Sequence, residues 1–141
     1  AKIVNLHLGL SPFYRGSATL FWPFVNRELE YLGTTIHLAT AKVDAGEILA
    51  RIDPDLRSGE TYYDITSRLI RDSIDRFPSV VSAYLEGRIR PACQEDIAGK
   101  LYRKADFSEA ALQQALGYVG AGLSEAEVRR IEARRECRYS Q

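Results

Sequence analysis

The first residues of the chain, AKIVNLHL, combine β-forming apolar residues with two spaced polar ones and predict a strand. Successive side chains of a strand point to opposite faces, so Ile3, Asn5 and His7 would share one face. Val4 and Leu6 would share the other face. Apolar residues on both faces are typical of a strand inside a sheet, usually a parallel one. Two polar side chains, Asn5 and His7, would then project together from the end of a buried strand.

The next stretches predict one helix and two short strands. Residues 17–32 carry apolar side chains at the spacing of one helix face, and Pro23 within them predicts a helix that is kinked or begins late. The segments 34–40 (TTIHLAT) and 46–52 (GEILARI) are rich in β-forming residues. The short segment AKVDAG joins these two predicted strands, and PDLRSG after them is a predicted turn.

A long amphipathic helix is predicted next. Thr61 and Asp64 have the T-x-x-D spacing of a capping box, and apolar residues at helical spacing follow them. Pro78 is expected to kink this helix or to open a second one. Gly87 is a plausible end for the helical stretch.

The C-terminal third is predicted to be a helical tail. Residues 92–107 fit an extended segment or a small hairpin. Ser108 is expected to cap a helix that runs through Gly117, and Ser124 a second helix that ends at about Arg135. Strands that alternate with helices in this order suit the second half of an α/β sheet.

Composition limits the classes of function. The chain has 141 residues, 45% hydrophobic and 27% charged, which is typical of one folded domain. Its net charge of zero gives no electrostatic reason to expect a nucleic-acid or anionic-membrane partner. No apolar run is long enough to predict a membrane span. Cys93 and Cys137 lack CxxC spacing, so a reduced, cytoplasmic chain is the simple interpretation.

The N-terminal strand also bears on domain organisation. The chain contains no Met and enters directly into a strand that needs neighbours, of which few follow. We therefore expect this chain to be the C-terminal part of a larger domain. The alternative is a complete small protein whose initiator Met has been removed.

Two groups of polar residues are candidates for chemistry. Asn5 and His7 are two residues apart in the predicted strand, and an amide can stabilise an oxyanion while a histidine moves protons near neutral pH. By itself this tripeptide is more often structural than catalytic. Asp44 lies in the loop between two strands, next to Gly46, where the backbone can turn tightly. Taken alone, Asp44 is better interpreted as a residue that caps its own turn.

Other polar residues have simpler interpretations. His37 is expected to be a buried histidine that supports its surroundings without reacting. Tyr14 and Arg15 could contact a planar or anionic ligand, although an exposed loop arginine usually binds nothing specific. The C-terminal stretch SEAEVRRIEARRECR mixes both charges and predicts a solvated helix face.

Taken together, the segments 5–16 (NLHLGLSPFYRG) and 33–49 (GTTIHLATAKVDAGEIL) resemble the folate-dependent formyltransferase family. This family includes glycinamide ribonucleotide, methionyl-tRNA and sugar-nucleotide formyltransferases. Its pattern is Asn-x-His, then Pro-Ser-Leu-Leu-Pro, Tyr-Arg-Gly or similar, a strand with a His, and a loop with Asp-x-Gly. The matching residues, in order, are Asn5, His7, Pro12, Tyr14, Arg15, Gly16, His37, Asp44 and Gly46. The resemblance runs from about residue 2 to residue 88 and fades beyond residue 98.

The resemblance implies both a fold and a reaction. The fold would be α/β: the C-terminal half of a Rossmann-like formyltransferase sheet domain in residues 1–92, with a helical tail in residues 93–141. The reaction would be transfer of a formyl group from 10-formyltetrahydrofolate to a primary amine, with amino-sugar nucleotides among the candidate acceptors. The family needs no metal for this reaction.

The resemblance also implies residue roles. Asn5 would donate a hydrogen bond to the formyl oxygen, and His7 would stabilise the intermediate and handle protons. Asp44 would favour the protonated form of His7 and position a water molecule. Backbone groups of the loop would contact the pterin ring, and this loop comprises Thr40, Ala41, Lys42, Val43 and Asp44.

The chain departs from the family pattern in two ways. After His7 it has Leu8-Gly9-Leu10-Ser11-Pro12, so the local backbone and the acceptor are expected to differ. This form is most similar to formyltransferase-like proteins associated with bacterial surface-polysaccharide genes. The family's N-terminal strands and phosphate loop are not in this chain, and we expect it to pair with an N-terminal half or to form a homo-oligomer.

Three alternatives remain open from the sequence. A formyltetrahydrofolate hydrolase would share Asn5, His7 and Asp44 and use water as the acceptor. Another one-carbon or carbamoyl transferase on the same fold is the second alternative. The third is a non-catalytic fragment that binds a partner.

Overall fold

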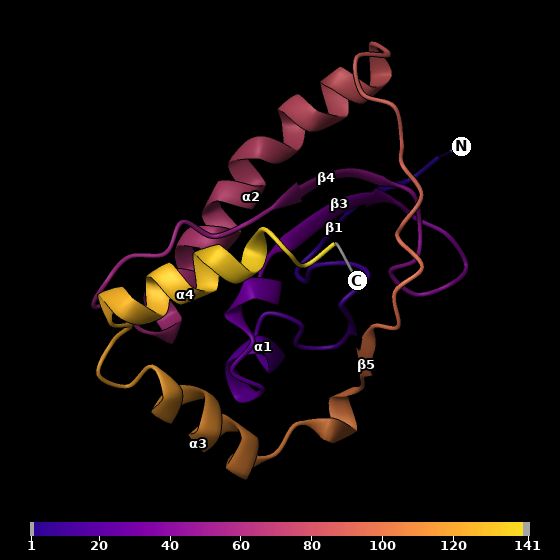
Figure 1. Ribbon diagram of the computed structural model, residues 1–141. Helices are drawn as coiled ribbons and strands as arrows, with labels where there is room; N and C mark the ends of the chain where they lie inside the picture. The colour runs from indigo at the N-terminus through magenta and orange to yellow at the C-terminus, as the bar shows by residue number, and fades with distance from the viewer. Residues whose placement is uncertain (1, 140–141) are drawn as a thin grey trace.

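The structure is a computed structural model that describes residues 2–139. Its centre is a three-stranded sheet of β1 (Val4–His7), β3 (Thr34–Leu38) and β4 (Ile48–Ile52), in the order β1-β3-β4 (Figure 1). Both pairs of strands are antiparallel, so the expected parallel pairing of the first strand is wrong within the described residues. There β1 lies at the sheet edge, because β3 pairs with it on one side and β4 continues beyond β3.

Different parts of the chain cover the two faces of this sheet. On one face the Thr34 hydroxyl lies 2.7 Å from the Ser73 hydroxyl of α2 (Tyr62–Leu85). On the other face Thr35 Oγ1 donates to the Gly9 carbonyl at 2.8 Å. Helix α2 therefore packs on the first face, and the loop that follows β1 packs on the second. This second face carries the polar residues considered below.

Helix α2 begins as its sequence predicts and does not break at the proline. Thr61 and Asp64 form the capping box, in which the Asp64 carboxylate accepts from the Thr61 amide at 2.9 Å. Pro78 lies inside one continuous helix of 24 residues. Its ring and the Ile74 side chain are both exposed, so the carbonyl that loses its partner lies on the solvent side of the helix.

The predicted helix at 17–32 is much shorter than expected. Only α1 (Trp22–Val25) and the 3₁₀ turn η1 (Leu29–Tyr31) are helical. Pro23 sits in the first turn of α1, which fits a helix that begins late. Ala18 and Arg27 both have φ of +55°, so the chain leaves helical geometry on either side of α1.

The C-terminal third folds back onto the rest of the chain. Figure 1 shows the segment after α2 crossing beside the ends of the strands before it reaches β5 (Lys100–Tyr102). Strand β5 pairs in parallel with β2 (Tyr14–Gly16), so the alternative of a local hairpin is wrong and the extended segment is confirmed. Helices α3 (Glu109–Tyr118) and α4 (Glu125–Arg135) follow, and Ser108 and Ser124 cap them as predicted.

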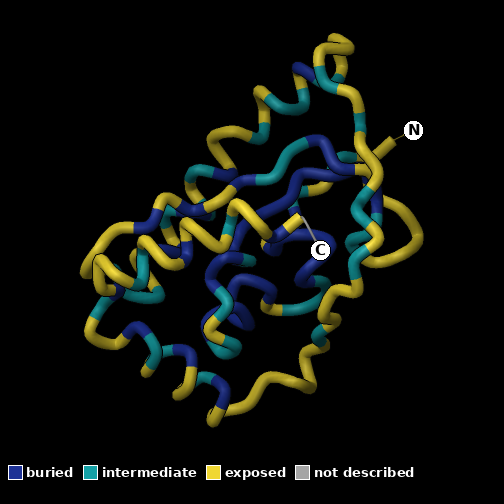
Figure 2. The backbone as a smooth tube through the Cα atoms, in the orientation of Figure 1, coloured by how far each residue is buried: buried dark blue, intermediate teal, exposed yellow. Residues whose placement is uncertain are grey.

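One hydrophobic core joins the two halves. Figure 2 shows buried backbone running through β3, the loop after β1 and the inner faces of the C-terminal helices. Ala115 and Ile131 of these helices belong to the same buried cluster as Phe24, Ile36 and Leu69. The predicted boundary at residue 92, between a catalytic domain and a helical tail, stays a prediction. The hydrophobic core includes residues from both sides of that boundary. Among the described residues, no helix has the length and apolar character that a membrane crossing requires.

Candidate active site

The strand register brings Asn5, His7 and His37 onto one face of the sheet. Asn5 pairs with His37, and His7 pairs with Thr35, across the antiparallel β1–β3 ladder. Val4 and Leu6 pair with the residues of β3 that face helix α2. The alternation predicted for the first strand is therefore confirmed, and it separates the polar residues from the apolar ones. His7 and His37 are buried, whereas Asn5 is exposed.

Asp44 reaches this face from the turn between β3 and β4. Its Oδ1 lies 3.5 Å from His7 Nδ1 and 3.8 Å from His37 Nε2. Its Oδ2 accepts a hydrogen bond from the Gly16 amide at 3.0 Å. The side chain of Asp44 is 14% exposed, so one carboxylate is held between two imidazoles at the margin of the solvent.

The backbone around Asp44 is tightly constrained. Asp44 has φ of +49°, a left-handed conformation that is uncommon outside glycine but that Asp tolerates better than most residues. A Cβ atom added to Gly46 would overlap the Leu38 carbonyl oxygen, so the turn passes against β3 where only glycine fits. Backbone strain of this kind is often found at functional sites.

The hydrogen bonds assign the proton positions of both histidines. His7 Nε2 lies 2.9 Å from the Tyr14 carbonyl, which can only accept, so Nε2 carries a proton and Nδ1 faces Asp44. His37 Nδ1 lies 3.0 Å from the Leu38 carbonyl, so it also carries a proton. His37 Nε2 is then free to accept from Asn5 Nδ2 at 3.2 Å. One hydrogen of the Asn5 amide is thereby fixed, and the second is available to another acceptor.

Burial sets the charge of His7. Burial lowers the pKa of His7 below its usual 6.5, and this effect outweighs the Tyr14 carbonyl and Asp44, which raise the pKa. The positive charge of Arg15 and the neighbouring His37 lower it further. Asp44 itself raises the pKa of His7, which is the direction that the resemblance implies, although burial outweighs this effect. His7 is neutral near pH 7, with the lone pair on Nδ1 able to accept a proton.

The loop after β1 is built against the His7 ring, which explains its unusual sequence. A Cβ atom on Gly9 would overlap His7 Nε2 and the Thr19 side chain. Thr35 Oγ1 donates to the Gly9 carbonyl at 2.8 Å and accepts from the Ser11 amide at 3.0 Å. The Leu8-Gly9-Leu10-Ser11-Pro12 segment therefore packs directly over the candidate site.

The other predicted site residues are Tyr14, Arg15 and the loop that precedes Asp44, and each has a different environment. The Tyr14 hydroxyl donates to Glu28 at 2.7 Å, and its buried ring stacks on Tyr102, so only its carbonyl reaches the site. Burial also raises the pKa of Tyr14, so its hydroxyl stays protonated. Arg15 donates to the Gln94 side chain at 3.1 Å. The remaining loop residues are exposed beside Asp44, and these are Thr40, Ala41, Lys42 and Val43.

Gln94 and Thr35 are site residues that the sequence analysis missed. Gln94 Nε2 donates to the carbonyls of Asp44 and Gly46, at 2.8 and 2.9 Å. Gln94 is 50 residues from Asp44, in a segment with no regular structure, so no local pattern could have pointed to it. The described residues include no cluster of three or more His, Cys, Asp or Glu side chains suited to a metal ion.

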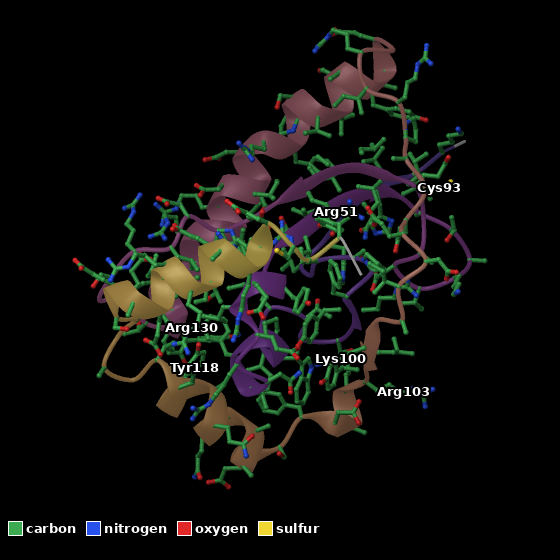
Figure 3. All side chains as sticks on the ribbon, in the orientation of Figure 1. Arg51, Cys93, Lys100, Arg103, Tyr118 and Arg130 are labelled. Carbon is green, nitrogen blue, oxygen red and sulfur yellow. The ribbon has the colours of Figure 1, made fainter. Side chains whose placement is uncertain are left out.

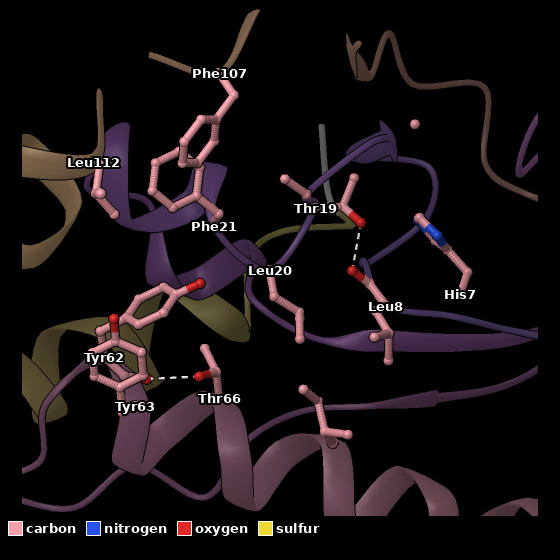
Figure 4. Close-up of a pocket in the computed structure, with 13 residues that line it drawn as sticks. His7, Leu8, Thr19, Leu20, Phe21, Tyr62, Tyr63, Thr66, Phe107 and Leu112 are labelled. Carbon is pink, nitrogen blue, oxygen red and sulfur yellow. Dashed lines mark hydrogen bonds between the residues drawn. The ribbon is translucent and has the colours of Figure 1, made fainter. Parts of the chain in front are cut away.

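A pocket of about 520 Å³ opens beside His7. Figure 4 shows His7 and Leu8 at one end of this pocket and the rings of Phe21, Tyr62 and Phe107 toward the other. Apart from His7, its described lining contains no ionisable side chain other than tyrosine. The pocket can therefore accept an uncharged or aromatic group next to the polar cluster.

The fold and the cluster define a class of site: an amide donor and a neutral histidine on an edge strand, and a carboxylate on a neighbouring turn, beside a pocket. Such groups suit the transfer of an acyl group with its accompanying protons. The chain belongs to the formyl transferase family, whose model matches residues 1–81. The family predicted from the motifs is confirmed.

A curated relative and two solved structures are similar to this chain. The methionyl-tRNA formyltransferase of Roseiflexus sp. (strain RS-1) is 35% identical over 96 residues, which cover 65% of this chain and 28% of that protein. The chain spans less than a third of the curated relatives it matches. One similar solved structure is the formyltransferase PseJ from Anoxybacillus kamchatkensis, in complex with UDP-4,6-dideoxy-4-formamido-L-AltNAc and tetrahydrofolate. Its TM-score is 0.64 at 21% identity, over 91% of this chain and 63% of that one.

The second solved structure is the N-formyltransferase from Helicobacter canadensis in complex with folinic acid and dTDP-3-aminofucose. Its TM-score is 0.68 at 17% identity, over 83% of this chain and 47% of that one. At these identities the likeness establishes the fold. The predicted α/β formyltransferase architecture, present as a partial domain, is confirmed.

Proposed function

We propose that the protein containing this chain transfers a formyl group from 10-formyltetrahydrofolate to a primary amine. The observation that carries the proposal is the single sheet face on which Asn5, His7 and the Asp44 carboxylate meet, with Oδ1 of Asp44 3.5 Å from His7 Nδ1. Family membership supports the reaction class. The solved structures with tetrahydrofolate and folinic acid support a folate as the formyl donor.

The proposed reaction follows from the proton positions at the site. The amine nitrogen attacks the formyl carbon, and the formyl oxygen becomes an oxyanion that accepts the free hydrogen of the Asn5 amide. Loss of one such donor costs about 3–4 kcal/mol in other enzymes. The proton of the attacking amine passes to His7 Nδ1, directly or through a water molecule beside Asp44. The carbonyl then re-forms as the bond from the formyl carbon to N10 of the folate breaks, and N10 takes up the proton that His7 received.

His37 and Asp44 support these steps without bonding to the formyl group. His37 Nε2 accepts from Asn5 and so fixes the plane of the amide. Asp44 stabilises the positive charge that His7 acquires, because its carboxylate faces Nδ1. We propose that the exposed loop from Thr40 to Asp44 contacts the pterin ring through its backbone.

The pocket beside His7 is the proposed place of the acceptor. Its aromatic walls suit the stacking of a sugar or base ring, and the absence of basic side chains in the described lining disfavours a phosphate there. An amino-sugar nucleotide with its sugar in this pocket is the acceptor we propose. The sugar nucleotides named with both solved structures support this class.

The test uses the natural protein that contains residues 1–141. Purified enzyme is incubated with 10-formyltetrahydrofolate and a panel of primary amines that includes amino-sugar nucleotides, and tetrahydrofolate, formate and formylated product are measured. We expect amine-dependent product and little formate. Formate release without an amine would instead assign a hydrolase that uses the same three residues.

Two variants check the assignment of roles. Asn5→Ala should lower kcat by about 10²–10³-fold, as loss of an oxyanion donor does elsewhere. His7→Ala should lower kcat by about 10²–10⁴-fold, as loss of a general base does. Thermal unfolding of Asn5→Ala should stay close to that of the parent, because Asn5 is exposed. Turnover within about threefold of the parent would remove the substituted residue from the mechanism.

A further inference from the structure

The carboxylate of Asp44 is placed by two separate parts of the chain. The turn between β3 and β4 carries Asp44 itself, and Gly16 at the end of β2 holds its Oδ2 at 3.0 Å. Nearby, the Ser11 hydroxyl donates to the Asp44 carbonyl at 3.3 Å. The position of Asp44 relative to His7 therefore depends on whatever joins the turn to β2.

Gln94 makes that connection. Its Nε2 donates to the carbonyls of Asp44 and Gly46, so both hydrogens of the amide are used on the turn. Its Oε1 accepts from Arg15 Nη2 at 3.1 Å, and Arg15 directly precedes Gly16. The orientation of the amide is fixed by chemistry, because carbonyls only accept and a guanidinium only donates.

The segment that carries Gln94 is itself anchored on both sides. This crossing segment, residues 92–99, begins where Ala92 exchanges two backbone hydrogen bonds with Ile48, at 2.7 and 2.9 Å. Glu95 pairs with Arg51 of β4, labelled in Figure 3, and the Lys100 amide that follows the segment donates to Phe13 at 2.7 Å. The crossing segment is thus a fixed frame from which Gln94 reaches the turn.

We propose that Gln94 is a positioning residue, which holds the Asp44 turn in its left-handed conformation and its carboxylate against His7. The proposal rests on the catalytic role proposed for Asp44. A displacement of about 1 Å at a catalytic group can cost about 100-fold in rate. The residue lies outside the part of the chain that the family model matches.

The first test is kinetic and uses Gln94→Glu in the natural protein. Glutamate keeps the length of the side chain and its acceptor toward Arg15, but it cannot donate to the two carbonyls. We expect kcat to fall by about 10-fold or more, within the range for a displaced catalytic group. The matched control is Gln114→Glu, the same chemical change at an exposed position of α3, which should leave kcat within about twofold.

A double-mutant cycle separates positioning from general destabilisation. If Gln94 acts through Asp44, Gln94→Glu should lower kcat no further in the Asp44→Asn background. Equal losses in both backgrounds, or a parent-like kcat for Gln94→Glu alone, would overturn the proposal. Failure of the proposed function is a different result, in which Asn5→Ala and His7→Ala also keep full activity.

A second measurement does not depend on turnover. The ring protons of His7 are titrated by NMR in the parent and in Gln94→Leu, which is neutral and of similar size. Asp44 raises the pKa of His7, whereas Arg15 and His37 lower it, so a displaced carboxylate should lower the His7 pKa. An unchanged His7 titration in folded Gln94→Leu would contradict the proposal.

Discussion

At the scale of the residue, the two histidines differ because of what their second nitrogens contact. His37 donates to its neighbouring carbonyl and accepts from Asn5, so both of its ring nitrogens are occupied. His7 donates to the Tyr14 carbonyl and leaves Nδ1 open toward Asp44. The interpretation of His37 as a supporting histidine agrees with these contacts. His7 therefore keeps a ring nitrogen that can accept a proton, as the proposed reaction requires.

The charge of Asp44 gives a pH-dependent prediction at this scale. A neutral His7 that accepts a proton loses activity as the pH falls through its pKa, which burial has already lowered. Asp44→Asn removes a charge that raises this pKa, so the pKa falls further. The acid limb of the kcat/KM profile should shift to lower pH, while the maximal rate decreases. An unshifted limb at the parent rate would leave Asp44 as a turn residue alone.

At the scale of the element, the sequence predicted correctly those helices and strands whose formation depends on neighbouring residues. The β3 and β4 strands, the capped start of α2 and the serine caps of α3 and α4 each depend on residues a few positions apart. The prediction of a helix over residues 17–32 was wrong. Its apolar spacing correctly indicated that Phe21, Trp22 and Phe24 are buried, but the backbone leaves helical geometry on either side of α1. The spacing of apolar residues indicates which side chains are buried, but it does not determine the backbone dihedral angles of the residues between them.

Non-local pairing could not be predicted in the same way. The three residues of β5 join β2 in parallel across 86 positions, from Tyr14 to Lys100, and no property of KLY distinguishes this partner from a nearby one. The same holds for Gln94, whose three partners lie in two distant segments, β2 and the turn between β3 and β4. The candidate residues Asn5, His7 and Asp44 were found through spaced motifs, whereas the contacts that orient them required the fold.

The turn that carries Asp44 gives a prediction at the scale of the element. Gly46→Ala places a methyl group against the Leu38 carbonyl oxygen, so the turn must move and carry Asp44 with it. We expect a loss of about 1–3 kcal/mol in unfolding free energy, as for other overpacked sites, together with reduced kcat. Chemical denaturation measures the first and the formyl-transfer assay the second.

Gly117→Ala in α3 is the matched control for this substitution. A Cβ atom at Gly117 would meet nothing within 4 Å, and alanine is favoured over glycine within a helix by about 1 kcal/mol. It should leave stability unchanged or slightly higher, with the parent kcat. Equal stability of the two alanine variants would show that the close approach at Gly46 is not limiting.

At the scale of the whole molecule, the C-terminal third contributes to the site as well as to the core. The crossing segment reaches Asp44 through Gln94, and Tyr102 of β5 stacks on Tyr14, whose carbonyl holds His7. Helices α3 and α4 add buried side chains to the cluster that contains Phe24 and Leu69. A substitution in this third of the chain is therefore expected to alter the geometry of the candidate site.

The last prediction is that residues 1–141, expressed alone, transfer no formyl groups. The chain spans less than a third of its curated relatives, and within the described residues the second edge of β1 pairs with no strand. An unpaired edge strand tends to pair with another chain, so this fragment should self-associate through β1. Holding donor and acceptor in reacting geometry can contribute about 7–11 kcal/mol to catalysis, and we expect residues 1–141 to supply only part of it.

The experiment compares this chain with the natural protein that contains it. Folding is checked by circular dichroism, association by sedimentation, and activity by release of tetrahydrofolate in the presence of amino-sugar nucleotides. Val4 is the first residue of β1, and Val4→Pro removes a backbone donor from the strand, as a proline on an edge does in natural sheets. We expect this proline to reduce the association of the fragment. Rapid turnover by a folded monomer of residues 1–141 would mean that this segment holds a complete site, with both substrates bound by the residues described above.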